Sequence, residues 1–193
     1  MKQAFKKIWL FIVCILGVFL LYYKYCGRYE KHLPKHEQEV IERIQRQKQM
    51  MEEFNKGLVK QENESILKYI ENSGNEYVET GTGLRYRIIN QGEGDIIKTG
   101  DIVALDYELR LLNGDLLYSS DENGRKVFEV GHGGVESGLE EAILHLHRGG
   151  EAEIIIPARL AHGLTGDGDR IPPKSTIVYK VKVIENQTNN YNN

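Results

Sequence analysis

The sequence predicts an α+β fold in which an antiparallel sheet wraps around one short helix. After Gly74, four segments are rich in β-branched and aromatic residues and alternate apolar with polar side chains; they are residues 84–89, 101–111, 151–156 and 176–184. Asn113-Gly114, between two apolar runs, is a strong hairpin signal. A single helical stretch, Gly138 to His145, is embedded among these strands. Strands with one embedded helix are typical of an α+β domain.

The N-terminal segment, residues 1–26, is expected to be a membrane anchor or a signal segment. Three lysines in the first seven residues precede an uncharged run from Ile8 to Tyr23. As a helix this run would span roughly 24 Å, somewhat less than the ~30 Å core of a bilayer. Three interpretations stay open: an uncleaved anchor helix, a lipoprotein acylated at Cys26, and a cleaved secretory signal. The basic N-terminus favours an orientation with the rest of the chain outside the cytoplasm, in the cell envelope or periplasm.

Residues 27–75 are expected to form an amphipathic helical spacer. Pro34 suits a helix start, and apolar residues recur at three- and four-residue spacing from Lys35 to about Asn55. Gly57 is expected to end this helix, and a second helical piece should run from Glu62 to Glu71. The same pattern allows a homodimer through residues 35–55, although the heptads are too few to choose between a spacer and a coiled coil.

The composition excludes several classes of function. Net charge is −3 with basic residues scattered along the chain, so no basic face for nucleic acid is indicated. Both cysteines lie in the first 26 residues, which excludes a disulfide framework or a cysteine-based metal site in the later domain. His145 and His147 have no further ligands nearby in the sequence, and no metal site is expected.

Three motifs in fixed order carry the functional signal. The first is Gly100-Asp101-Ile102-Val103, which leads into the strand of Tyr107. The second is Phe128-Glu129-Val130-Gly131 followed by Val135-Glu136-Ser137-Gly138-Leu139. The third is Ile156-Pro157-Ala158-Arg159-Leu160-Ala161-His162-Gly163, followed by Ile171-Pro172-Pro173 and the closing strand with Tyr179. Together they resemble an FK506-binding-type (FKBP) peptidyl-prolyl cis/trans isomerase. The N-terminal anchor and helix resemble bacterial membrane-associated members, including the gliding-motility-associated type.

The resemblance divides the chain into four parts: 1–26, an anchor or signal; 27–75, the helical spacer; 76–186, the isomerase domain; and 187–193, a disordered tail. It implies rotation about X-Pro bonds, whose resonance barrier is about 18–20 kcal/mol. A planar amide carries charge on its oxygen and the twisted amide carries less, so a dry apolar pocket favours the twisted state. No nucleophile, metal or cofactor is required.

The resemblance also assigns the site. Expected catalytic residues are Tyr107, His162 and Tyr179; expected substrate-binding residues are Leu117, Tyr118, Val135, Glu136, Leu139 and Ile171. Tyr107 should form a wall, Leu139 the floor, and Glu136 should act through its backbone N–H. Tyr118 stands where the family commonly has Asp, and His162 where it commonly has Tyr.

Two functions follow from this assignment. The first is a prolyl isomerase that assists the folding of exported proteins and acts on proline-containing polypeptides. It is expected to prefer an apolar residue before proline, because Val135, Leu139 and Ile171 should line the slot. The second is a catalytically weak, tethered module that binds proline-containing segments of a partner complex, and the substitutions at Tyr118 and His162 keep it open.

Overall fold

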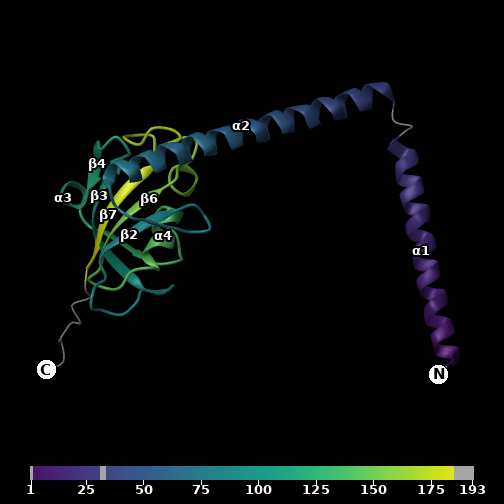
Figure 1. Cartoon of the computed structure of the whole chain (residues 1–193), viewed down its shortest axis with the longest axis horizontal. Coiled ribbons are helices and arrows are strands. Elements are labelled where there is room, and N and C mark those ends of the chain that lie inside the picture. Colours follow the sequence, from purple (N-terminus) through teal and green to yellow (C-terminus); the bar gives the residue numbers. More distant parts are fainter. Residues whose placement is uncertain (1, 31–33, 185–193) are drawn as a thin grey trace. The chain divides into compact units, whose positions relative to one another are not determined.

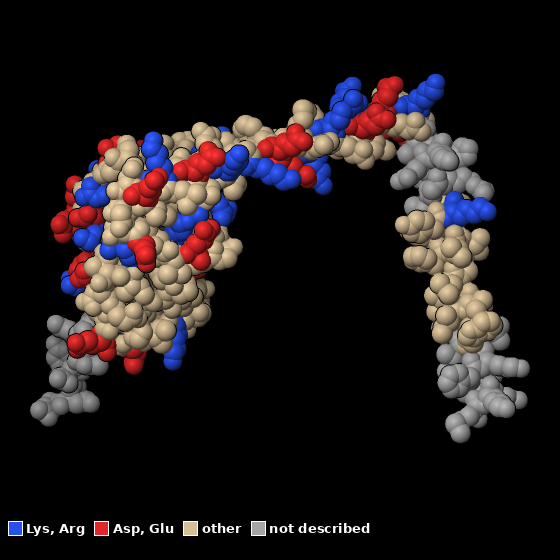
Figure 2. All heavy atoms as spheres, viewed as in Figure 1, with Lys and Arg blue, Asp and Glu red and all other residues tan. Residues whose placement is uncertain are grey.

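The computed structural model describes residues 2–30 and 34–184 and divides the chain into two compact units, Met1–Gly57 and Leu58–Asn193 (Figure 1). The first unit holds helix α1 (Lys2–Glu30) and the first part of helix α2 (Lys35–Ser73). The second holds the end of α2 and all the strands. Basic and acidic side chains are interspersed over its visible face (Figure 2). The predicted disordered tail, 187–193, lies outside the described residues.

Helix α1 covers the segment that was expected to be an anchor. No helix in the part of the chain that the structure describes is long and apolar enough to cross a membrane. The anchor prediction depends in part on residues 2–8, 10 and 11, whose side chains lie outside the described residues. The side chain of Cys26 lies outside them as well.

Helix α2 is one uninterrupted helix, so the predicted break at Gly57 is wrong. A glycine inside a helix costs only about 1 kcal/mol relative to alanine, and strong helix formers surround it. The helix ends instead at Ser73, and the positive φ of 65° at Gly74 suits the residue after a helix C-terminus. Val40, Ile41 and Ile44 are exposed, and the homodimer through residues 35–55 stays a prediction.

The seven strands form one antiparallel sheet in the order β1-β2-β6-β7-β3-β4, with β5 paired to β3. Their bounds are β1 Val78–Glu79, β2 Arg85–Asn90, β3 Ile102–Leu111, β4 Leu116–Ser119, β5 Lys126–Glu129, β6 Glu151–Ile156 and β7 Ile177–Val183. The four predicted strands are therefore confirmed, and so is the hairpin at Asn113-Gly114 between β3 and β4. The short strands β1, β4 and β5 were not predicted separately.

Strand β3 is long enough to serve two partners along one edge. Its second half pairs with β4 and its first half with β5, while β7 covers its other edge. A short helix, α3 (Ser120–Asn123), carries the chain from β4 to β5. Strands β4 and β5 therefore lie beside opposite halves of the same strand, β3.

The main core lies between the sheet and α4 (Ser137–Ile143), which confirms the helix predicted at Gly138 to His145, whereas the short helix α3 was not predicted. Leu139, Ala142 and Ile143 of α4 are buried against the strands. A Cβ at Gly138 would overlap Ile156 Cγ2, so the helix can approach β6 this closely only with glycine at that position. This close packing holds the first turn of α4 against β6.

The opposite face of the sheet packs against the last turns of α2. Ile66 is buried with Ile155 and Val178, which alternate with the residues that face the main core. Glu62 adds polar contacts: its Oε1 accepts hydrogen bonds from the backbone N–H of Ala158 (2.6 Å) and from the hydroxyl of Thr176 (2.7 Å). The end of α2 is thus an integral part of the second unit.

We expect Glu62→Ala to destabilise the second unit by about 1–3 kcal/mol, because it leaves the buried Ala158 N–H and Thr176 hydroxyl without an acceptor. Urea unfolding followed by circular dichroism measures this free energy. The control is Glu64→Ala, which removes only an exposed pair with Lys60 at 3.9 Å and should cost about 0–0.5 kcal/mol. Equal losses in the two variants would contradict the proposed contact.

Candidate functional site

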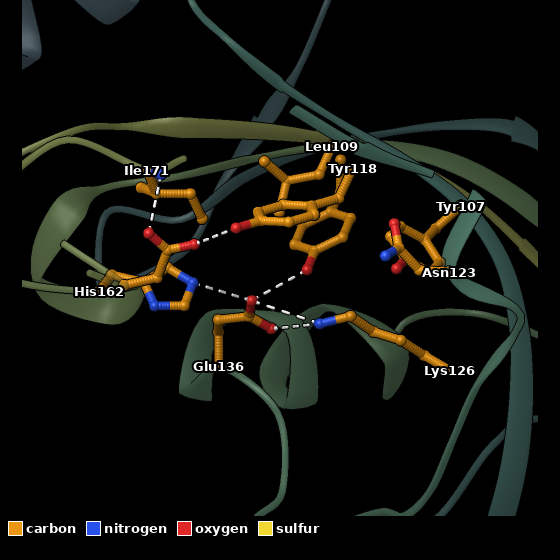
Figure 3. A pocket seen from close by; sticks show the side chains of 10 residues that line it. Tyr107, Leu109, Tyr118, Asn123, Lys126, Glu136, His162 and Ile171 are labelled. Atoms are coloured by element: carbon orange, nitrogen blue, oxygen red, sulfur yellow. Dashed lines mark hydrogen bonds and ion pairs between the residues drawn. The ribbon is translucent and has the colours of Figure 1, made fainter. Parts of the chain in front are cut away.

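One pocket of about 220 Å³ opens at an end of the sheet (Figure 3). It is lined by Tyr107, Leu109, Tyr118, Asn123, Lys126, Glu136, His162, Asp167, Ile171 and Tyr179. All three expected catalytic residues and three of the expected binding residues are among them. Sequence regions more than 70 residues apart therefore converge here, as the resemblance to the FKBP family implied.

The position of each lining residue follows from the strand, helix or loop that carries it. Tyr107 and Leu109 are two residues apart on β3 and so share a face. Tyr179 sits directly opposite Leu109 on β7. Glu136 is the residue that precedes the first turn of α4. The loop after the short 3₁₀ helix η1 (Ala158–Leu160) supplies the His162 side of the pocket.

Three predicted binding residues do not line the pocket. Leu139 is 0% exposed and belongs to the core, because α4 turns that face toward the sheet. Leu117 and Val135 are half-buried and pack against the same core. The expected preference for an apolar residue before proline was based on Val135, Leu139 and Ile171 as lining residues. Of these three, Ile171 alone lines the pocket.

Four lining residues were missed by the sequence analysis: Leu109, Asn123, Lys126 and Asp167. The two-residue period of a strand could have found Leu109 from Tyr107. Lys126 lies two residues before Phe128 of the second motif, so the same period would have placed the two on one face. Asn123 and Asp167 lie outside every quoted motif, and no sequence signal identifies them.

Glu136 is the polar centre of the site. Its side chain is only 7% exposed, and its Oε1 accepts the hydroxyl hydrogen of Tyr179 at 2.9 Å. His162 Nε2 lies 3.1 Å from the same oxygen, and Lys126 Nζ lies 3.2 Å from Oε2. The sequence analysis expected Glu136 to act through its backbone N–H, whereas the structure points its carboxylate into the pocket (Figure 3).

This arrangement shifts the ionisation of the groups around Glu136. Burial by itself would raise the pKa of Glu136, but the positive charge of Lys126 and the hydrogen bonds from Tyr179 and Lys126 outweigh it, so the pKa lies below its ordinary value. Burial, followed by the nearby Glu136 charge, raises the pKa values of Tyr179 and Tyr107. At neutral pH the carboxylate is therefore charged and both phenols are protonated.

A second carboxylate lies at the other side of the pocket. Tyr118 donates its hydroxyl hydrogen to Asp167 Oδ2 at 2.6 Å, a hydrogen bond that raises the pKa of Tyr118 to about 12. The backbone N–H groups of Asp169 and Ile171 donate to Asp167 Oδ1 at 2.9 and 2.8 Å. Burial would raise the pKa of Asp167, but these three hydrogen bonds outweigh it and lower the pKa. The site thus holds a carboxylate although position 118 itself is a tyrosine.

The chemistry available here is that of a binding slot. Aromatic and aliphatic surfaces of Tyr107, Leu109, Ile171 and Tyr179 surround the space. Of the polar groups, Tyr179, His162 and Lys126 contact Glu136, and Tyr118 contacts Asp167. In the described ranges, no group of three or more His, Cys, Asp or Glu side chains could hold a metal ion. The predicted absence of a metal and a cofactor stays a prediction.

Comparison with known proteins gives the same family that the motifs suggested. The family model for FKBP-type peptidyl-prolyl cis-trans isomerases matches residues 94–184. A probable FKBP-type isomerase FkpA of Neisseria meningitidis is 40% identical over 128 residues, which are 65% of this chain and 46% of that protein. The FKBP-type 22 kDa isomerase of Escherichia coli is 40% identical over 121 residues, 62% of this chain and 58% of that protein. The chain thus spans about half the length of these relatives.

Solved structures agree with this assignment. The crystal structure of AtFKBP13 superposes with a TM-score of 0.55 at 28% identity, covering 57% of this chain and 98% of that one. The crystal structure of FkpA from Escherichia coli superposes with a TM-score of 0.58 at 25% identity, covering 80% of this chain and 73% of that one. Residues 94–184 of this chain, just under half of its length, therefore match the FKBP-type peptidyl-prolyl cis-trans isomerase family.

Proposed function

We propose that this protein is a peptidyl-prolyl cis/trans isomerase that binds X-Pro segments in the pocket and assists the folding of exported proteins. The observation that carries the proposal is the slot itself, in which Tyr107 and Tyr179 lie with ring centroids 5.9 Å apart beside Leu109 and Ile171. An apolar slot with aromatic walls suits a proline ring. The names of the similar proteins support the same reaction.

The pocket suits this reaction because no bond has to be broken. Rotation opposes a barrier of about 18–20 kcal/mol that comes from amide resonance, and uncatalysed exchange takes tens to hundreds of seconds. The charge on the carbonyl oxygen falls as the amide twists. A slot that excludes water therefore stabilises the twisted amide relative to the planar one.

The second candidate function is a weak isomerase that mainly binds proline-containing segments of a partner. One observation favours it. Four ionisable side chains, Lys126, Glu136, His162 and Asp167, are among the residues that line the pocket. A polar lining favours the twisted amide over the planar one less than an apolar lining would.

We further propose that the domain is tethered in the cell envelope, outside the cytoplasm, as in membrane-associated members of the family. The proposal is supported by Lys2, Lys6 and Lys7 before the uncharged run from Ile8 to Tyr23. An uncleaved anchor and acylation at Cys26 are the two forms of tether. The gliding-motility-associated subtype stays a prediction.

The isomerase proposal predicts that the purified full chain accelerates exchange of several X-Pro peptides in a protease-coupled or NMR exchange assay. Tyr179→Ala should lower kcat/KM and cost about 3–5 kcal/mol of stability, because it opens the base of the slot. Tyr179→Phe keeps the ring and should retain most of the stability. A folded wild-type protein that gives only the uncatalysed rate with every peptide would favour the binding module.

The position of His162 in the pocket predicts that its side chain affects activity. His162→Tyr exchanges the imidazole for a phenol and changes the contact with Glu136, so kcat/KM for X-Pro peptides should change while the circular dichroism spectrum stays the same. The matched control is His132→Tyr, at an exposed histidine outside the pocket, which should keep the wild-type kcat/KM. Equal kcat/KM values for wild type and His162→Tyr would rule out the pocket role.

The tether is tested at Cys26. If an uncleaved helix holds the protein, Cys26→Ser should change neither its retention in the membrane fraction nor its intact mass beyond the substitution itself. Fractionation and mass spectrometry measure both. Loss of retention in this variant, or palmitate incorporation at Cys26 in the wild type, would identify a lipoprotein instead.

A further inference from the structure

Three donors from three different elements converge on the single carboxylate of Glu136. Tyr179 comes from β7, Lys126 from β5 and His162 from the loop that follows η1. Their distances to the carboxylate oxygens lie between 2.9 and 3.4 Å. Figure 3 shows the dashed lines from Lys126 and His162 meeting at Glu136. None of the quoted motifs predicts this arrangement.

The convergence pairs polar groups that line the pocket with one another. A carboxylate has about four acceptor positions, so one group can serve all three donors. The ammonium of Lys126 also lies 5.5 Å from the centroid of the Tyr107 ring and 5.3 Å from that of Tyr179. Because Glu136 and the two rings surround this cation, its charge is largely compensated inside the protein.

The contact with Glu136 also determines which ring nitrogen of His162 carries the proton. An ionised carboxylate can only accept a hydrogen bond, so Nε2 must be the N–H nitrogen. In a neutral imidazole, Nδ1 is then an acceptor. The one N–H of neutral His162 is therefore committed to Glu136.

Whether these donors are occupied affects how easily the amide of a bound X-Pro segment can rotate. A donor on the carbonyl oxygen stabilises the planar amide more than the twisted one, because the planar form carries more charge on oxygen. An interaction that is stronger in the ground state slows the step. We propose that Glu136 is a positioning residue for the isomerisation: it holds the donors of Tyr179, His162 and Lys126 away from the carbonyl oxygen of the bound amide. This inference rests on the proposed isomerase function.

The kinetic test uses Glu136→Gln in the full chain, which keeps the side-chain shape and removes the charge. Donors released from Glu136 bind the planar amide, so KM should fall or stay unchanged, and kcat should drop about tenfold, the size expected for one hydrogen bond of ordinary net strength. The matched control is Glu140→Gln on the same helix, whose carboxylate accepts from the N–H of Gly133 outside the pocket. It should leave both constants unchanged. An unchanged or increased kcat in Glu136→Gln overturns the proposal.

The second test determines the tautomer of the His162 ring and does not depend on isomerase activity. In a series of long-range ¹H–¹⁵N spectra recorded at rising pH, the neutral ring of wild-type His162 should show the Nε2–H tautomer. In Glu136→Gln the tautomers should mix, because a glutamine amide can donate as well as accept. An Nδ1–H tautomer in the wild type, or an unchanged ring in the variant, overturns the proposal. If the wild type instead lacks isomerase activity while its tautomer is as expected, the proposed function fails and the positioning of His162 by Glu136 stands.

Discussion

The pocket depends on one constraint: a carboxylate that is almost fully withdrawn from water must be compensated by the protein. Glu136 is 7% exposed, and a buried charge without partners would cost several kcal/mol. The compensation comes from β5, β7 and the loop after η1 at once. Satisfying this one group therefore attaches the loop after η1, which is not part of the sheet, to the strands β5 and β7.

The sheet makes that convergence possible through the length of β3. Because β4 and β5 share one edge of β3, Tyr118 and Lys126 are brought to the same pocket from opposite halves of the strand. Gly138 lets α4 approach β6 closely enough to place Glu136 beneath them. On the far face of the sheet, Glu62 and Ile66 attach the end of α2 to β6, β7 and the segments beside them.

The site also shows how a local departure from a family pattern can be offset at a distance. Tyr118 stands where an acidic residue is common, which suggested the loss of a carboxylate. The structure brings in Asp167 from a separate loop, 2.6 Å from the Tyr118 hydroxyl. Its three hydrogen bonds keep it ionised beside the slot. The chemistry of the pocket therefore cannot be judged position by position.

The sequence by itself determined the main strands, the Asn113-Gly114 hairpin and the embedded helix α4, because periodicity and turn residues are local properties. The placement of Tyr107, His162 and Tyr179 in one pocket was implied by the resemblance to the FKBP family. It did not reveal the continuity of α2 through Gly57, where surrounding helix formers outweigh one glycine. Nor did it show that Leu139 faces the core or that the Glu136 carboxylate gathers Lys126. Those features depend on strand register and helix packing, which join residues distant in the chain and were decided only by the tertiary structure.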